Sequence, residues 1–536
     1  MLTLNRLMVQ RRLGWGIVVM VWLLMAVSGR LEAQIVWTGN TSTTWSTGAN
    51  WIGGAAPNAN GAIADFSTTP TSLTPTLTAA TTLGNITFST SSAITIGGSK
   101  TLTMRASAAN TPTGISLTGT TGTLAISAAV SLRAGDNFFI NNSDSAANGM
   151  SFTGGVTTTA TSNITVAGSG STTFSTTAIS GAGNLTVNGG TVTMGALANS
   201  YTGNTTINGG TLSVGSLVSG GSNSGIGSSN SSQVNLIING GTLQYTGAAV
   251  STTRNFTLGT SGGTLDASGS AALTLSNTTA FTLAGSNTAR TLTFTGTSTA
   301  ANTFALPIGD NGSGKTSVDK TGAGNWTLTA ANTFTGTATV SAGVLKLNAT
   351  GNGAMGDVGS VVVNSGGTLL LGAANQINGS STAGAGSMTL GGGTFATGGF
   401  GQGSGMLGTL TLSTTSTIDL GAGTSVVHYA ASNGQAWTGE LVVLNWNGII
   451  GSGGGTDQLF FGSSTTGLTS SQVNEIVFEN PNGVAGNYSA EILNTGEVVA
   501  FKPIPEPGTF AAGGLLVGLA AWWERRRRQV PGRFRS

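Results

Sequence analysis

One short pattern recurs through the middle of this 536-residue chain: two glycines, a threonine and an apolar residue. It occurs at positions 189–192, 209–212, 240–243, 262–265, 366–369 and 392–395. The spacings are 20, 31 and 22 residues in the first run and 26 residues in the second. These are coil lengths of a β-solenoid, in which each coil buries its apolar face only against its neighbours.

The pattern also has a local reason to turn the chain and then extend it. Glycine adopts a positive φ at little cost, and a threonine followed by an apolar residue opens a strand that alternates between solvent and core. The 87 glycines would suit a disordered coil, but 38% hydrophobic content in short alternating runs favours strands. We predict an all-β fold: an elongated parallel β-solenoid over residues 67–436. Strand runs do not fix strand direction, so an antiparallel sandwich array is the alternative.

A longer unit is repeated as well. Residues 320–347 read Lys-Thr-Gly-Ala-Gly-Asn-Trp-Thr-Leu-Thr, Ala-Ala-Asn-Thr-Phe-Thr-Gly and Thr-Ala-Thr-Val-Ser-Ala-Gly-Val-Leu-Lys-Leu, and a diverged copy covers 180–212. In both copies seven residues separate two turn glycines, Gly203 from Gly210 and Gly336 from Gly343. These units resemble the autotransporter-associated β-strand repeat, which implies a surface β-helix protein of the passenger type.

Two segments of different amino-acid composition flank the predicted solenoid. Residues 34–66 contain Trp37, Trp45 and Trp51, and resemble the opening segment of exported proteins that carry this repeat. We interpret them as an N-terminal cap over the first coil; a platform on which sugars stack is the alternative. Residues 437–500 hold longer polar–apolar segments and 6 of the 14 acidic residues of 34–500, and we interpret them as a C-terminal cap.

The N-terminus has the three parts of a secretory signal peptide over residues 1–33. Basic residues precede an apolar stretch, 13–27, and small residues follow it. We expect signal peptidase to cleave between Ala33 and Gln34, with cleavage after Ser28 as an alternative. An uncleaved anchor is disfavoured because 15 apolar residues are short for a bilayer span.

The C-terminus carries a second tripartite signal over residues 504–528. Pro505, Glu506 and Pro507 form a stiff, extended motif, because each proline fixes φ and blocks helix entry. An apolar segment, 509–523, would form a short transmembrane helix of about 22 Å at ~1.5 Å per residue. The four arginines that follow hold that end in the cytoplasm, and they are Arg525, Arg526, Arg527 and Arg528.

This tail resembles the PEP-CTERM sorting signal. The resemblance implies recognition by an exosortase-type membrane peptidase, transient anchoring in the inner membrane and delivery to the cell surface or extracellular matrix. A plain tail anchor is the alternative. A self-transporting autotransporter is disfavoured, because a barrel would end in alternating amphipathic strands rather than in an arginine-rich sequence.

The charge of the chain separates the ends from the body. The pI of about 9.1 comes from the two termini. Residues 34–500 carry 8 Lys and Arg against 14 Asp and Glu, a net charge of −6, so nucleic-acid binding has no electrostatic basis there. The chain has no cysteine, which excludes disulfides and thiolate chemistry.

Two motif matches point to chemistry that the surrounding sequence does not support. Residues 309–316 satisfy the phosphate-loop pattern, but no helical period follows them. Residues 259–263 satisfy the nucleophile-elbow pattern, but the lone histidine, His428, has no neighbouring carboxylate. We expect no cofactor and no histidine-built metal site.

Within residues 34–500 the tightest groups of charged residues are Asp310, Lys315, Asp319 and Lys320, and the pair Glu475 and Glu479. Calcium binding by Asp310 and Asp319 is an alternative, but the repeated Gly-x-Asp pattern of calcium-binding β-rolls is missing. We therefore expect a non-enzymatic, adhesin-like protein that contacts polysaccharide through stacked Thr, Asn and Ser. The alternative is a polysaccharide lyase or hydrolase, which convergence of three or more charged residues on one face would favour.

Overall fold

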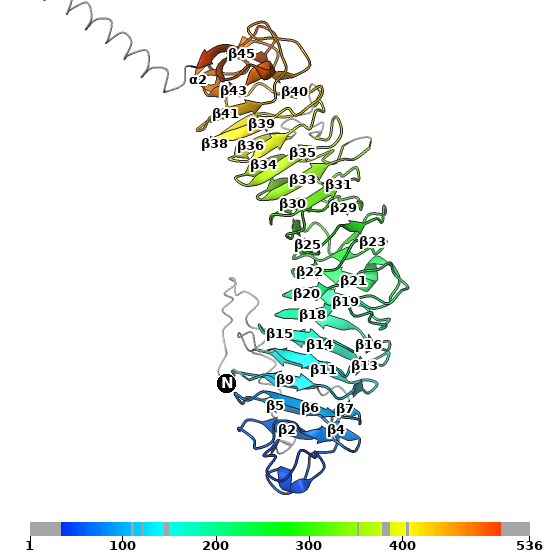
Figure 1. Cartoon of the computed structure of the whole chain (residues 1–536). Helices are drawn as coiled ribbons and strands as arrows, with labels where there is room; N and C mark the ends of the chain where they lie inside the picture. The colour runs from blue at the N-terminus through cyan, green and yellow to red at the C-terminus, as the bar shows by residue number, and fades with distance from the viewer. Residues whose placement is uncertain are drawn as a thin grey trace, which may run out of the picture.

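The computed structural model describes residues 34–108, 112–119, 122–143, 149–350, 353–377, 386–403 and 407–504. They form a long rod of stacked coils that runs from the blue N-terminal end to the orange-red C-terminal end in Figure 1. The described strands belong to sheets of 11, 5, 15 and 14 strands. Among the described strands the pairing is parallel up to β43, and only the pairs β42–β45, β43–β44 and β44–β45 are antiparallel. The predicted parallel solenoid is confirmed, and the sandwich alternative is wrong.

Each sheet takes one short strand from successive coils. The 11-stranded sheet contains β1 (Gln34–Val36), β2 (Ile63–Phe66), β5 (Asn85–Phe88), β8 (Thr113–Leu117), β11 (Asn137–Asn142), β14 (Asn163–Ala167), β17 (Leu185–Val187), β19 (Thr205–Ile207), β21 (Leu236–Ile238), β24 (Thr257–Leu258) and β27 (Thr282–Leu283). The five-stranded sheet contains β4 (Thr81–Leu83), β7 (Leu102–Met104), β10 (Val130–Leu132), β13 (Val156–Thr157) and β16 (Ile179–Ser180).

The other two sheets are longer. The 15-stranded sheet contains β3 (Thr76–Leu77), β6 (Ile94–Gly98), β9 (Leu124–Ile126), β12 (Met150–Phe152), β15 (Ser171–Phe174), β18 (Thr191–Gly195), β20 (Thr211–Val214), β22 (Thr242–Tyr245), β25 (Gly263–Ala267), β28 (Arg290–Thr295), β30 (Thr316–Lys320), β32 (Thr337–Val340), β34 (Ser360–Asn364), β36 (Ser387–Gly391) and β38 (Leu410–Thr414). The 14-stranded sheet contains β23 (Val250–Thr252), β26 (Leu273–Leu275), β29 (Asn302–Phe304), β31 (Asn325–Leu328), β33 (Gly343–Leu347), β35 (Gly367–Leu371), β37 (Thr394–Ala396), β39 (Ser416–Asp419), β40 (Val426–Tyr429), β41 (Leu441–Leu444), β42 (Gln458–Phe461), β43 (Ile476–Glu479), β44 (Asn487–Ile492) and β45 (Glu497–Ile504).

Helices are few and short in the described part of the chain. They are α2 (Ser470–Asn474) and four 3₁₀ turns, Gly48–Asn50, Gln233–Asn235, Thr465–Gly467 and Pro481–Gly483. Within those residues no helix is both long and apolar enough to span a membrane. The predicted signal peptide and the predicted helix over 509–523 lie outside the described residues.

The recurrent Gly-Gly-Thr pattern opens strands at two different corners of the coil. The first four copies start neighbouring strands of the 15-stranded sheet, and their threonines are in register. The last two copies start β35 and β37 of the 14-stranded sheet, where Thr368 pairs with Thr394. In every copy the apolar residue that follows is buried. One local signal therefore serves any corner where a turn must lead into a strand.

Glycine is needed for two reasons, which the repeat 320–347 shows together. Gly343 has a φ of 62°, a conformation that side chains rarely adopt. At Gly336 a Cβ atom would lie 2.2 Å from the carbonyl oxygen of Thr316 in the preceding coil. The first glycine permits the turn, and the second permits two coils to approach each other.

Tryptophans fill the N-terminal end of the rod. Trp37, Trp45 and Trp51 are 0%, 1% and 3% exposed, and Trp51 packs edge-on against the other two rings at 4.9 and 4.7 Å between centroids. Their indole N–H groups donate to the carbonyls of Ser72, Pro57 and Trp45. Since no ring face is exposed, these residues do not form a sugar-stacking platform, and that alternative is wrong.

The C-terminal end is closed by a change of strand direction. Parallel pairing continues through β41 to β43, and β44 and β45 then add antiparallel strands. The short helix α2 packs beside them and begins with a capping box between Thr469 and Gln472. The end of the stack is thereby paired with chain rather than left as an open strand edge.

Buried cations tie the coils together without acidic partners. Arg254 is 4% exposed, and its guanidinium donates to the carbonyls of Val218, Ser229 and Gly227 at 2.9, 3.1 and 2.7 Å, and to that of Ser222 at 3.3 Å. These acceptors all belong to the long connection between β20 and β21. Lys320 is fully buried, and its ammonium donates to the carbonyls of Thr321, Gly322 and Ala342 at 2.7, 2.7 and 2.9 Å. Burial lowers the pKa of Lys320 to about 8.

We expect Arg254→Met to loosen the connection between β20 and β21. The substitution leaves four carbonyls without their donor, at a cost of about 1–3 kcal/mol for buried groups. Hydrogen–deuterium exchange should therefore accelerate at least about tenfold for amides in residues 216–232. Arg133→Met, which removes an exposed arginine, is the matched control. Equal exchange in that connection in both variants would show that the guanidinium does not hold it.

The buried lysine predicts a specific pH dependence of stability. The folded-state pKa of Lys320 is about 8, below the ordinary value of 10.5, so between these values the unfolded chain binds a proton that the folded chain does not. Stability should therefore rise with pH across this window. The rise in the urea midpoint between pH 7.5 and 10 should be smaller in Lys320→Met than in wild type. Lys346→Met is the control, and an identical rise in all three chains would contradict the prediction.

Candidate functional site

Hydroxyl side chains form one long row on the outer face of the 15-stranded sheet. The parallel register places one residue per coil at the same position, and neighbouring strands lie ~4.8 Å apart. Nine of the eleven positions are Ser or Thr, interrupted by one carboxylate and one valine. The row is Ser171, Thr191, Thr211, Thr242, Thr264, Thr293, Asp319, Thr339, Val362, Thr389 and Thr411. None of these side chains is fully buried, so the face presents a hydroxyl row that only Asp319 and Val362 interrupt.

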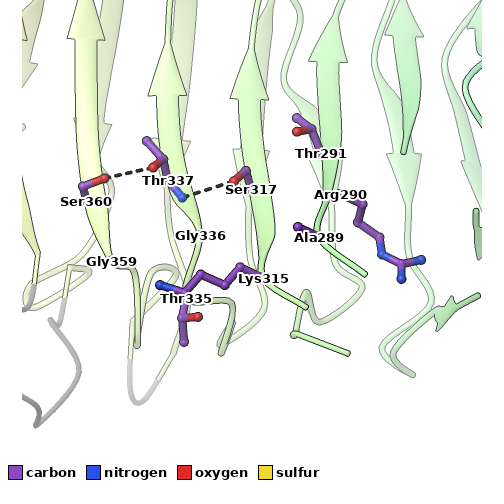
Figure 2. A pocket seen from close by; sticks show the side chains of 10 residues that line it. All are labelled: Ala289, Arg290, Thr291, Lys315, Ser317, Thr335, Gly336, Thr337, Gly359 and Ser360. Carbon is purple, nitrogen blue, oxygen red and sulfur yellow. Dashed lines mark hydrogen bonds between the residues drawn. The ribbon is translucent and has the colours of Figure 1, made fainter. Parts of the chain in front are cut away.

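The same face is hollowed into a groove of about 500 Å³ across β28, β30, β32 and β34. Figure 2 shows hydroxyls from three adjacent strands lined up along it, those of Ser317, Thr337 and Ser360. The Thr337 and Ser360 hydroxyl oxygens are 3.0 Å apart, and the backbone N–H of Thr337 donates to Ser317 Oγ at 3.3 Å. The groove is completed by Ala289, Arg290, Thr291, Lys315, Thr335, Gly336 and Gly359.

Few charged residues line this groove, and they differ in whether a ligand in the groove could contact them. Lys315 is exposed and its side chain lies along the edge of the groove near Thr335 (Figure 2). The guanidinium of Arg290 is instead bound to the carbonyls of Leu258 and Thr288, at 2.9 and 3.1 Å, and points away from the groove in Figure 2. Asp319 lies in the adjacent row, where burial raises the pKa of its carboxyl and the Thr339 hydroxyl opposes the rise. The groove thus offers hydroxyls and one free ammonium.

Asp310 organises the turn beside the groove rather than a ligand site. Its Oδ1 accepts from the backbone N–H of Thr316 at 2.7 Å, and its Oδ2 accepts from the Thr335 hydroxyl at 2.6 Å. The residues that match the phosphate-loop pattern lead into a strand, β30. A phosphate-binding loop would instead lead into the N-terminus of a helix. Within the described residues no three His, Cys, Asp or Glu side chains are grouped to hold a metal ion.

The remaining charged residues are spread over different surfaces. Asp319 faces outward from β30, whereas its neighbour Lys320 is buried on the opposite side of the strand. Glu475 ends α2 and Glu479 ends β43, and both are exposed. The convergence of charges that would favour a lyase or hydrolase is not seen among these residues.

His428 and the serine of the elbow motif belong to separate parts of the rod. His428 lies on β40, stacked on Phe460 with ring centroids 4.2 Å apart and an angle of 4° between planes. Burial lowers the pKa of His428, so the ring is predominantly neutral at pH 7. Ser261 lies in the turn before β25, where its backbone N–H donates to the side chain of Asn239. No base is brought to this serine by His428.

The predicted targeting residues fall almost wholly outside the described part. Gln34 is the first residue of β1 and pairs with Ile63. Ala33 lies outside the described residues, as do the proposed sorting residues Pro505, Glu506, Pro507 and Arg525 to Arg528. Both processing sites therefore remain predictions.

Sequence reasoning anticipated hydroxyl faces but missed the groove. The coils differ in length, so the sequence alone does not show that Ser317, Thr337 and Ser360 are neighbours. One sequence signal could have pointed to the groove. Each strand that lines it has a small polar residue near its start, followed two positions later by a second outward residue. That signal is common to most strands of this chain.

Comparisons with known proteins agree with the repeat architecture. The passenger-associated transport repeat family model matches residues 188–214 and 318–347, the same two regions that carry the longer repeat. The chain is similar to the adhesin BmaC autotransporter of Brucella suis biovar 1 (strain 1330), with 34% identity over 137 residues. That match covers 26% of this chain and 4% of the relative. No solved structure matches the chain. The chain thus contains passenger-type repeats and shares part of its sequence with an adhesin.

Proposed function

We propose that this chain is an exported, adhesin-like surface protein that holds extracellular polysaccharide by many weak contacts and performs no catalysis. The observation that carries the proposal is the hydroxyl row of the 15-stranded sheet, together with the groove that opens into it. Polysaccharides present repeated hydroxyls, and a rigid row of donors and acceptors can engage several sugar units at once. The partial similarity to an adhesin supports the same class of function.

The charge distribution supports contact rather than turnover. A glycan-cleaving site needs paired carboxylates or a base placed at the scissile bond. Here the Asp310 carboxylate is engaged in a turn, and Asp319 lies on the opposite side of β30 from Lys320. The lyase or hydrolase alternative therefore has no specific observation in its favour.

We further propose that the two ends of the chain direct its export. Signal peptidase would cleave between Ala33 and Gln34, and an exosortase-type peptidase would recognise the Pro505–Pro507 motif before releasing the body from the inner membrane. The support is the order of the sequence parts: basic, apolar and small residues at one end, and Pro-Glu-Pro, a short apolar segment and arginines at the other.

The groove predicts which hydroxyls contribute to binding. We expect the triple variant Ser317→Ala, Thr337→Val and Ser360→Ala to weaken polysaccharide binding about tenfold, since each lost hydrogen bond contributes about 0.5–1.5 kcal/mol. Co-sedimentation with cellulose, xylan and alginate provides the measurement.

The matched control alters three hydroxyls that are in register on the 14-stranded sheet: Thr274→Val, Thr303→Val and Thr327→Val. This control should bind as wild type does. Equal loss in both triple variants would locate binding elsewhere, and failure of the wild-type chain to bind any of the three polymers would refute the adhesive proposal.

The sorting proposal is tested by replacing Pro505, Glu506 and Pro507 with alanine in a host that has an exosortase. The variant should stay unprocessed in the membrane fraction, whereas the wild-type chain should reach the cell surface with Gln34 as its first residue. Mass spectrometry and N-terminal sequencing measure both ends. The wild-type chain in a host without the exosortase is the control, and unchanged delivery of the variant would disprove the sorting role.

A further inference from the structure

A second hollow lies on a different face of the rod, beside Phe139. This residue is on β11 of the 11-stranded sheet, and its side chain is 40% exposed. Its neighbour in the register is Gly114 on β8. A cavity of about 250 Å³, lined in part by Gly114, opens next to the aromatic ring. An exposed aromatic ring beside a hollow offers a face on which a ligand can stack.

The lining of this hollow is uncharged and combines apolar with polar residues. Thr87, Ser116 and Asn141 form the next row of outward residues on three adjacent strands, β5, β8 and β11. Asn85 lies in the same row as Gly114, on its other side. The lining is completed by Ile63, Ile86, Pro112, Thr113 and Ile115. An apolar surface is thus bordered by hydroxyl and amide groups.

A ladder of asparagine amides crosses the same sheet in the row that lies two residues before the ring. Asn163 donates from Nδ2 to Asn137 Oδ1 at 2.9 Å, and Asn184 donates to Asn163 Oδ1 at 2.8 Å. Asn137 is two residues before Phe139 on β11, so the ladder and the ring share the outer face.

We propose that Phe139 and the hollow beside it form a binding site for one sugar ring of a neutral, equatorially linked β-glycan. The C–H face of such a pyranose packs on the aromatic ring, and its equatorial hydroxyls reach Asn85, Ser116 and Asn141. A purely apolar ligand would bury these polar groups without partners, which costs free energy. An anionic sugar would find no cation among the lining residues. The inference rests on the proposed function and adds a site on a separate sheet.

Isothermal titration calorimetry of the full chain with cellohexaose and mannohexaose tests the site. Phe139→Ala should weaken binding at least about tenfold, and Phe139→Trp should retain it, because any aromatic face of sufficient size serves. Phe400→Ala is the matched control, since Phe400 is 38% exposed elsewhere on the rod. Thermal unfolding of each variant checks that the fold is unchanged.

The outcomes separate this site from the groove of the 15-stranded sheet. Equal binding by Phe139→Ala and wild type would overturn the proposal. It would also be overturned if the wild-type chain bound neither cellohexaose nor mannohexaose. If polymers still bind through Ser317, Thr337 and Ser360 in that case, the proposed function stands and only this site fails. Loss of hexasaccharide binding in Phe139→Ala, with retention in Phe139→Trp and Phe400→Ala, supports it.

Discussion

The parallel backbone ladder between coils is the constraint on which the rest of this molecule depends. Each strand donates to and accepts from the strand one coil away, so the spacing along the rod is fixed by hydrogen bonds. Side chains are then stacked by position rather than by sequence distance. The buried column of Leu, Ile, Val and Phe, the outward threonine row and the asparagine ladder all follow from this one repeat.

Absence of charge is part of the same arrangement. A stack of coils places like side chains at ~4.8 Å, so a charged residue at a repeated position would face its own copies. The chain uses charge sparingly, and where Arg254, Arg290 and Lys320 enter the interior, backbone carbonyls solvate them. These cations stabilise irregular places: a long connection, a turn and the start of a repeat.

The sequence was informative where the physics is local. Paired glycines predicted turns, the alternation after Thr191 or Thr368 predicted strands, and the coil spacing predicted the solenoid. Interactions between coils could not be predicted from the sequence. The run of parallel strands past residue 436, the burial of Trp37 and its neighbours, and the pairing of Phe139 with Gly114 depend on register, which varying loop lengths conceal. The groove was missed for the same reason.

The constant rise per coil gives the rod the property of a ruler. Seven strand steps separate β12, which belongs to the same coil as Phe139, from β30 in the groove, and this corresponds to about 34 Å along the axis at ~4.8 Å per step. Insertion of one coil between them would lengthen that separation by a fixed increment and leave both surfaces intact. Insertion or deletion of whole coils can therefore change the distance between the two surfaces in fixed steps, while each surface keeps its own side chains.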